Sequence, residues 1–370
     1  MKARRILVIT GSRAEFGLLR STLDALAAHP GIERLLAVTG SHLIGRNPTI
    51  REVESKYFVD AVVEMHHESE QRTRSSYGLA FARGVEGITN VLTRLDPDVM
   101  LVLGDRIEVF AAASAAALLG VRVAHVHGGD VAVGVADDSI RHATTKLSHL
   151  HFAATRSSAD RVLAMGESPE SVFVVGSPAI DGLASIDPLD DVAWAAHGSP
   201  EILVQMHPTG ESDDVEHDRA RDLFESISDC GRVLLLAPNI DPGSDGIRSA
   251  IIGSGLPFID HLPRSEFIGL LKRVGMLIGN SSAGLLECAA MGVRVLDIGD
   301  RQEGRERGLN VIHTDFVTGP EFEEALNAVR TSRKSCVDPR FGDGFTGPRI
   351  VDILATMNRE RFSVRKRWHS

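Results

Sequence analysis

The chain has 370 residues, of which 43% are apolar and 24% charged, so it is long enough for two domains and too hydrophobic to be disordered. Its formal net charge of -10 argues against a nucleic-acid surface, while a local basic site for a phosphorylated small molecule remains compatible with it. Three cysteines without paired spacing are typical of a reducing compartment, and the apolar run Ile6–Ile9 is too short for a signal peptide or a membrane span. We therefore expect a cytoplasmic protein that does not bind membranes.

The first half of the chain alternates apolar runs with amphipathic segments. Buried strands are predicted at Arg5–Thr10, Leu35–Thr39, Val59–Met65, Pro97–Leu103, Val121–Val126, His151–Ala154 and Ser171–Val175. Helices are predicted at Glu15–His29, Tyr77–Leu95, Glu108–Leu119 and Ser158–Met165, and from the N-terminal signal Asp137-Asp138-Ser139. This alternation indicates a parallel, doubly wound sheet.

The pattern loosens over residues 176–188, and the same alternation then restarts. Strands are predicted at Ile202–Gln205, Val233–Leu236, Met276–Ile278 and Arg294–Ile298, with helices at Glu216–Ser228, Arg264–Val274 and Ala283–Met291. We predict an α/β protein with two Rossmann-like, doubly wound domains that face each other across a cleft. The predicted domains cover 1–182 and 183–345, and 346–370 contains a closing helix.

Polar side chains gather where the predicted strands end. Seven such clusters contain Arg13, His42, Asp105, Asp130, His207, Asn280 and Arg301. In open α/β sheets the carboxyl edge is where ligands bind. Ordinary turn chemistry explains any one cluster, but seven at one edge favour a ligand site.

The helix predicted from Asp137 has two distinct faces. Its predicted core face carries Ile140, Ala143, Leu147 and Leu150 at helical spacing. The other face carries Asp138, Arg141, His142, Thr145 and His149. A short acid, a guanidinium and imidazoles differ from the Glu and Lys of an ordinary solvated face, so we expect this face to meet a polar ligand. A solvated face on an Asp-capped helix is the alternative.

Several cofactor motifs are missing from the sequence. It contains no G-x-G-x-x-G that opens a helix after a predicted strand, no G-x-x-x-x-G-K-[ST], and neither H-E-x-x-H nor C-x-x-C. We therefore expect no nicotinamide cofactor, no ATP-driven phosphoryl transfer and no dedicated metal site. The chemistry is expected to depend on carboxylates and imidazoles.

Phosphate-binding features are concentrated in the second half. Gly279-Asn280-Ser281-Ser282 before a helix offers backbone N–H groups and two hydroxyls to a diphosphate, with plain N-capping by the serines as the alternative. Glu287, later in that helix, is a candidate for binding a ribose hydroxyl. Further candidates, each with a structural or surface role as the alternative, are Arg13, Arg301 and Arg305 for phosphates and His207 for the sugar.

Eight segments between about Arg5 and Ile312 together resemble one family. They are GSRAEFGLL, LGDR, HVHGGD, DDSIRHATTKLSHLHF, VGSPAID, HPTGE, GNSSAGLLE and GDRQEGRERG. The chain resembles the hydrolysing UDP-N-acetylglucosamine 2-epimerases of sialic- or legionaminic-acid-type sugar biosynthesis. The resemblance implies a GT-B type fold, a nucleotide on the C-terminal domain, a last helix that crosses back to the N-terminal domain, and homodimers or homotetramers.

The resemblance also implies a reaction on a UDP-linked sugar. UDP-N-acetylglucosamine, or a UDP-2,4-diacetamido-trideoxyhexose, would lose its C2 proton and UDP to give a glycal, and water would then add at C1 while a proton returns to C2. By matching position, Asp105 and Asp130 would be the acid/base groups, with Asp138, Arg141 and His207 shaping the sugar site. The implied substrate- and UDP-binding residues are Arg13, His42, Arg106, His142, Asn280, Ser281, Ser282, Gly284, Glu287, Arg301 and Arg305.

One catalytic position departs from the family pattern. Asp130 stands where the family usually has Glu, and a displacement of ~1 Å in a catalytic group can cost ~100-fold in rate. Two alternatives therefore stay open. One is an enzyme of the same fold that uses an acceptor other than water at the anomeric carbon, and the other is a catalytically silent nucleotide-sugar-binding protein.

Overall fold

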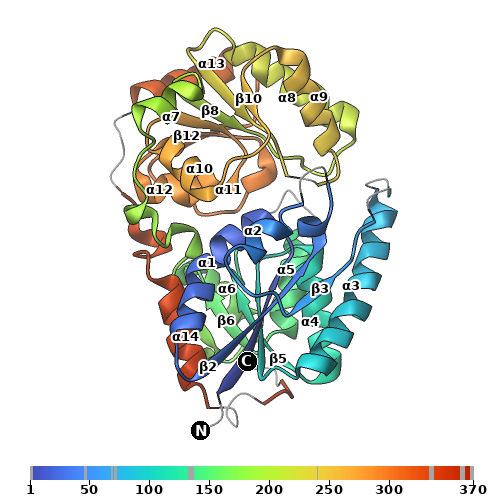
Figure 1. Ribbon diagram of the computed structural model, residues 1–370. Helices are drawn as coiled ribbons and strands as arrows, with labels where there is room; N and C mark the ends of the chain where they lie inside the picture. Colours follow the sequence, from blue (N-terminus) through green and yellow to red (C-terminus); the bar gives the residue numbers. More distant parts are fainter. Residues whose placement is uncertain are drawn as a thin grey trace. The chain divides into compact units, whose positions relative to one another are not determined.

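The computed structural model describes residues 3–45, 48–67, 70, 73–131, 137–239, 241–332, 337–358 and 363–366 (Figure 1). The chain divides into two compact units. Unit 1 contains Met1–Asp130, Asp137–Asp181 and Gly342–Ser370, and the main segment of unit 2 is Gly182–Phe341. Among the described residues, no helix combines the length and apolar character needed to cross a membrane.

Unit 1 is built on a seven-stranded sheet in the order β3-β2-β1-β4-β5-β6-β7. Every neighbouring pair is parallel. The strands are β1 Arg4–Thr10, β2 Ile32–Thr39, β3 Ala61–Val63, β4 Val99–Leu103, β5 Arg122–Val126, β6 Leu150–Ala153 and β7 Val172–Val174.

Helices cover both faces of this sheet, because alternate residues of its buried strands point to opposite sides. In β1, Ile6 and Val8 join a core with α1 and α14, whereas Leu7 and Ile9 join a core with α3 and α4. The helices are α1 Arg13–Ala28, α2 Ile50–Glu54, α3 Arg74–Leu95, α4 Ile107–Leu119, α5 Asp137–Leu147, α6 Arg156–Ala164 and α14 Thr346–Thr356. Short 3₁₀ turns lie at η1 Gly40–Leu43, η2 Pro169–Ser171 and η3 Pro178–Ile180.

The closing helix α14 belongs to unit 1 and packs against α1 (Figure 1). The carboxylate of Asp181 accepts hydrogen bonds from the backbone N–H groups of Thr346 (2.9 Å) and Gly347 (2.7 Å), which satisfies two donors at the start of the helix. A Cβ atom on Gly347 would lie 2.6 Å from the carbonyl carbon of Ser21, so glycine permits the close approach of the two helices.

Unit 2 repeats the architecture with a six-stranded sheet, in the order β10-β9-β8-β11-β12-β13. Its strands, which all pair in parallel, are β8 Ile202–Gln205, β9 Val233–Leu236, β10 Phe258–Ile259, β11 Met276–Gly279, β12 Arg294–Ile298 and β13 Val311–Thr314. Its helices are α7 Asp191–Ala196, α8 Asp213–Ile227, α9 Ser244–Ser254, α10 Arg264–Leu271, α11 Ser282–Leu285, α12 Glu287–Met291 and α13 Gly319–Thr331. Its 3₁₀ turns are η4 Leu183–Ser185, η5 Asp300–Gln302 and η6 Pro339–Phe341.

The prediction of two doubly wound parallel sheets is confirmed. In each sheet the strand order reverses beside the first strand of the unit, between β1 and β4 and between β8 and β11. Ligands of such folds bind outside the carboxyl ends of the strands at this reversal. One predicted helix is wrong in detail, because the segment from Ala283 to Met291 is broken at Leu286 (φ -97°, ψ -73°) into α11 and α12.

Candidate functional site

The seven predicted polar clusters all follow the carboxyl ends of parallel strands. Arg13, His42, Asp105 and Asp130 follow β1, β2, β4 and β5 of unit 1, and His207, Asn280 and Arg301 follow β8, β11 and β12 of unit 2. Each unit therefore carries a group of candidate residues at the edge where its fold binds ligands. The two groups are described separately.

Asp105 and Arg141 form the central ion pair of the group in unit 1. Asp105 leaves β4 through Gly104 (φ 85°), and its carboxylate pairs with Nη2 of Arg141 on α5. Arg141 is only 2% exposed, the largest of the fully buried side chains. A buried guanidinium needs a charge partner, and Asp105 supplies it.

This ion pair changes the predicted inner face of α5. Arg141, Thr144 and Thr145 are buried, whereas Ile140 and Leu147, which were assigned to the core face, are only half-buried. The predicted core face is therefore wrong in part: Leu147 packs against a core cluster and Leu150 is buried at the start of β6, but buried polar side chains share the inner side of the helix. Helical periodicity places apolar residues inward by default, but here a buried polar network occupies the inner face.

His125 links the β4 turn to the same helix. A carbonyl only accepts hydrogen bonds, so Nε2 of His125 donates to the carbonyl oxygen of Gly104 at 2.7 Å, and Nδ1 accepts from the Thr145 hydroxyl at 3.2 Å. Burial lowers the pKa of His125 to about 3, so the ring is neutral at physiological pH. This histidine fixes the turn that presents Asp105, and its role was not predicted from the sequence.

Asp130 is held by two side chains whose roles were not predicted from the sequence. Its Oδ2 accepts a hydrogen bond from Nδ1 of His127 at 2.7 Å, and its Oδ1 accepts one from the Ser158 hydroxyl at 2.7 Å. His127 has φ 65° and also hydrogen-bonds to the Ser177 hydroxyl at 2.9 Å. A left-handed backbone at a histidine is costly and persists because three side chains hold the turn. The only local signal was the spacing of His127 three residues before Asp130.

Arg13 and His42 lie at the ends of β1 and β2. Arg13 is half-buried, and burial lowers its pKa to about 10 although Glu52 opposes the shift. His42 is fully buried, and its ring nitrogens hydrogen-bond to the hydroxyls of Thr10 (3.1 Å) and Thr49 (2.7 Å). Burial, with the nearby charges of Arg13 and Arg106, lowers the pKa of His42 to about 4. This neutral ring ties the two strand ends together.

Two buried acids lie near Arg106. Glu108 is 0% exposed, and its Oε2 accepts a hydrogen bond from Nε of Arg106 at 3.4 Å. Glu15 accepts a hydrogen bond from the backbone N–H of Gly11 at 2.9 Å, and burial raises its pKa to about 8. Neither acid was predicted. Glu15 lies in the first turn of α1 and Glu108 in the first turn of α4, and these helices follow β1 and β4.

Asp138 and His142 are the more exposed candidates on α5. Nε2 of His142 lies 3.3 Å from Oδ2 of Asp138, one helical turn away, and the side chains are 36% and 24% exposed. Together with Asp105, Asp130 and Arg141, they place three carboxylates, a guanidinium and an imidazole on segments that begin at this edge.

In unit 2, His207 and Asn280 join the two strands at the sheet reversal. The backbone N–H of His207 donates to Oδ1 of Asn280 at 2.7 Å, and Nδ2 of Asn280 returns a hydrogen bond to the carbonyl of His207 at 2.8 Å. The carbonyl of Asn280 also accepts from Nη1 of Arg301 (3.0 Å) and from Nε2 of Gln302 (2.8 Å). Gln302 was not predicted. It helps to hold Asn280, which directly precedes Ser281 and Ser282.

The remaining predicted residues of unit 2 surround α11 and α12. Ser281 caps α11 by accepting from the backbone N–H of Ala283 at 3.3 Å, and Ser282 begins the helix. A Cβ atom on Gly284 would lie 2.9 Å from Cγ1 of Val295, so this glycine serves the packing of α11 on β12. Glu287 pairs with Arg264 at 3.1 Å, and Arg305 is half-buried after η5.

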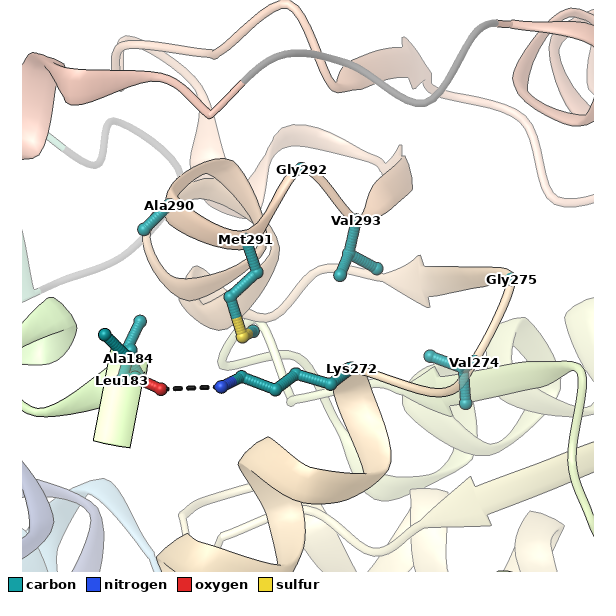
Figure 2. Close-up of a pocket in the computed structure, with 9 residues that line it drawn as sticks. All are labelled: Leu183, Ala184, Lys272, Val274, Gly275, Ala290, Met291, Gly292 and Val293. Carbon is teal, nitrogen blue, oxygen red and sulfur yellow. Dashed lines mark hydrogen bonds between the residues drawn. The ribbon is translucent and has the colours of Figure 1, made fainter. Parts of the chain in front are cut away.

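A pocket of about 340 Å³ in unit 2 lies away from these residues (Figure 2). Gly275 and Val293, which line it, directly precede β11 and β12, so the pocket is at the amino ends of the strands. Lys272 reaches across it to donate a hydrogen bond to the carbonyl of Leu183 at 2.7 Å. Among the described residues, no group of three or more His, Cys, Asp and Glu is arranged to hold a metal ion.

The chain is similar to known proteins over nearly its whole length. Residues 24–355 match the family described as UDP-N-acetylglucosamine 2-epimerase. The chain is 35% identical to the UDP-N,N'-diacetylbacillosamine 2-epimerase (hydrolyzing) of Legionella pneumophila, covering 96% of each chain. It is 30% identical to the UDP-N-acetylglucosamine 2-epimerase of Neisseria meningitidis serogroup B, covering 99% of this chain and 98% of the relative.

A solved structure with the same fold is that of the Methanocaldococcus jannaschii UDP-GlcNAc 2-epimerase in complex with UDP-GlcNAc and UDP. It superposes with a TM-score of 0.81 at 20% identity and covers 95% of this chain and 100% of that one. This likeness confirms the predicted GT-B type fold class.

Proposed function

The chain belongs to the UDP-N-acetylglucosamine 2-epimerase family, and we propose that it is a hydrolysing nucleotide-sugar 2-epimerase. Its substrate in this proposal is UDP-N-acetylglucosamine or a UDP-2,4-diacetamido-trideoxyhexose, and its products are the free 2-epimeric sugar and UDP. The 35% identity to a relative named as hydrolysing supports this type of epimerase. The observation that carries the proposal is the ion pair of Asp105 with the buried Arg141 at the ligand edge of unit 1.

The proposed reaction needs two proton transfers at C2, and no cofactor takes part in either of them. A base removes the C2 proton while the C1–O bond breaks and its electron pair leaves with UDP, so that a C1=C2 double bond forms. Water then adds at C1, and an acid returns a proton to the opposite face of C2. In the proposal Asp105 and Asp130 perform these proton transfers, while Asp138, Arg141 and His207 shape the sugar site.

The rest of the candidate residues are proposed to hold the substrate. In unit 2, the Ser281 and Ser282 hydroxyls bind the diphosphate, helped by Arg301 and Arg305, and Glu287 binds the ribose. Asn280 and Gly284 keep this loop and helix in place through the contacts described above. In unit 1, Arg13 and Arg106 supply positive charge close to His42, and His42 and His142 complete the proposed substrate contacts.

The deciding experiment is incubation with UDP-N-acetylglucosamine, and separately with a UDP-2,4-diacetamido-trideoxyglucose, in deuterium oxide with NMR detection. We expect free 2-epimeric sugar with deuterium at C2, together with UDP. A product without deuterium at C2 would rule out the elimination route. A 2-epimer that remains linked to UDP would show an epimerase of the non-hydrolysing type.

The hydrogen bonds and the short side chain of Asp130 favour a second candidate function. Both of its carboxylate oxygens accept hydrogen bonds within the protein, and its side chain is shorter than the glutamate usual in the family. An enzyme in which Asp130 does not serve C2 would transfer the sugar from UDP to an acceptor other than water. A transferred sugar with unchanged C2 stereochemistry would identify it, whereas tight UDP binding without turnover would identify a silent binding protein.

The proposal also includes a homodimer or homotetramer and no metal. Sedimentation velocity of the intact chain tests the assembly, and a monomer at micromolar concentration would contradict it. Turnover is expected to survive dialysis against EDTA, because carboxylates alone move the protons. A loss of activity that added Mg²⁺ restores would contradict this part.

A further inference from the structure

Arg264 is a half-buried cation that contacts the residue proposed to bind the ribose. Its Nη1 atom lies 3.1 Å from Oε1 of Glu287, and the two side chains are only 16% and 6% exposed. Arg264 is the first residue of α10 and Glu287 is the first residue of α12. The sequence motifs in this half of the chain do not include Arg264, and the proposed reaction gives it no role.

The position of the pair relates it to the ligand edge of the sheet. Arg264 follows the carboxyl end of β10, and Glu287 follows that of β11. In the sheet these two strands are separated by β9 and β8, so the ion pair bridges the exits of strands that are not neighbours. Side chains at this edge of a doubly wound sheet are placed to meet a ligand.

The electrostatics explain why a ribose-binding carboxylate needs such a partner. A bound diphosphate carries negative charge, and a second buried anion close to it is unfavourable unless a cation compensates it. Arg264 supplies this charge and holds one oxygen of Glu287 in a charge-assisted hydrogen bond. The carboxylate is then oriented to accept a hydrogen bond from a ribose hydroxyl with its second oxygen.

We propose that Arg264 is a positioning residue that makes the site select ribonucleoside diphosphates over their deoxy analogues. The inference rests on the proposed function, because it takes UDP as the ligand of unit 2 and Glu287 as the ribose contact. It adds that the selectivity depends on the contact between Arg264 and Glu287.

The test is calorimetric binding of UDP, 2'-deoxy-UDP and 3'-deoxy-UDP to the full chain. We expect the wild type to bind UDP about tenfold or more tightly than at least one deoxy analogue, as for a hydrogen bond to a charged group. Arg264→Met should reduce that ratio to about threefold or less, and Arg264→Lys, which keeps the charge without the planar fork, should give an intermediate ratio. With the nucleotide-sugar substrate, Arg264→Met should raise KM more than it lowers kcat.

Arg248→Met is the matched control. Arg248 also pairs with an acid of unit 2, at 2.7 Å from Oδ1 of Asp260, but that acid is 69% exposed and has no proposed part in the site. The control should keep the wild-type ratio. A control that loses selectivity as Arg264→Met does would overturn the inference, because the effect would not be particular to the Glu287 contact.

The outcomes separate this inference from the proposed function. Selectivity in Arg264→Met equal to the wild type, or a wild type that binds UDP without selectivity, overturns the role of Arg264 and leaves the epimerase proposal standing. A wild type that binds no UDP overturns the proposed function itself. If Arg264→Met does not fold, the double variant Arg264→Met/Glu287→Gln replaces it, since it leaves no unpaired buried charge. The double variant should match Glu287→Gln alone, and a further loss of selectivity in it would overturn the inference.

Discussion

At the scale of single residues, the proposed chemistry depends on Asp105 more than on any other side chain. Asparagine in its place keeps the shape but cannot take a proton, so Asp105→Asn is expected to lower kcat by about 10²–10⁴-fold. The change in UDP affinity should stay within about threefold, because the proposed nucleotide contacts lie in unit 2. Steady-state kinetics by NMR and UDP calorimetry measure the two effects.

Asp160→Asn is the control for this prediction. Asp160 also pairs with an arginine of unit 1, Arg156 at 3.0 Å, but it is 56% exposed. The Asp160→Asn substitution should leave kcat unchanged. An Asp105→Asn variant with wild-type turnover would remove Asp105 from the mechanism.

Glu15 makes stability depend on pH in a direction opposite to that of most acids. Its pKa of about 8 in the folded chain lies above the usual carboxyl value because of burial. Between about pH 4.5 and 8 the folded state therefore holds a proton that the unfolded state has lost, and stability falls as pH rises through this window. Glu15→Gln, which stays neutral, should be more stable than the wild type at pH 8 by roughly 2–4 kcal/mol, with a much smaller difference at pH 5.

Urea denaturation of both proteins at the two pH values measures this difference. Glu33→Gln is the control, because Glu33 is 47% exposed beside Arg5 and its substitution should show little pH dependence. An identical stability difference for Glu15→Gln at pH 5 and pH 8 would show that Glu15 is ionised in the folded chain throughout.

At the scale of elements, α5 is anchored at the end opposite to its candidate residues. Nζ of Lys366 donates to the carbonyl of Lys146 at 2.8 Å and pairs with the buried Glu167 at 2.8 Å. Glu167 also pairs with Lys146 at 2.6 Å and His151 at 3.0 Å. A cation at the last carbonyls of a helix satisfies groups that have no partner within it. This cluster fixes the helix that carries Arg141.

Glu167→Gln should therefore destabilise unit 1. Burial raises the pKa of Glu167, but the hydrogen bonds and charges of His151, Lys146 and Lys366 outweigh it and hold the pKa at about 2. Breaking a buried ion pair by removing one partner costs about 3 kcal/mol or more at pH 7. The lowered pKa of Glu167 stabilises the fold fully only above about pH 4.5, the carboxyl pKa in the unfolded chain. The difference in stability between Glu167→Gln and the wild type should therefore shrink as pH falls from about 4.5 toward 2.

Urea denaturation at pH 7 and pH 3.5 measures the effect. Glu225→Gln is the control, because Glu225 is 74% exposed and its loss should cost less than about 0.5 kcal/mol. Equal stability of Glu167→Gln and the wild type at pH 7 would mean that the cluster is not needed to hold α5.

At the scale of the whole molecule, the proposed nucleotide contacts belong to unit 2 and the proposed proton transfers to residues of unit 1. UDP alone is expected to slow hydrogen exchange in unit 2, around Asn280–Glu287, because the proposed diphosphate and ribose contacts are there. An intact, non-hydrolysable sugar nucleotide should add protection around Asp105 and along α5 in unit 1. Mass spectrometry of exchange in the two complexes measures both patterns, and protection of unit 1 alone by UDP would reverse the proposed assignment.

The sequence by itself determined the α/β class, most strands and helices, and the edge at which polar residues gather. Apolar runs such as Ile6–Ile9 must be buried, and a parallel sheet brings all its carboxyl ends to one edge, so both features follow from local pattern. The elements α2, α7, β10, α9, β13 and α13 were not predicted.

Only the tertiary structure decided how the candidate residues are paired. The burial of Arg141 on α5 follows from its pairing with Asp105, which comes after β4, and periodicity contains no information about such a partner. Asp130 meets Ser158, and Glu287 meets Arg264, 23 residues before it in sequence. These contacts join segments that are distant along the chain, so strand order and packing, rather than local propensity, bring them together.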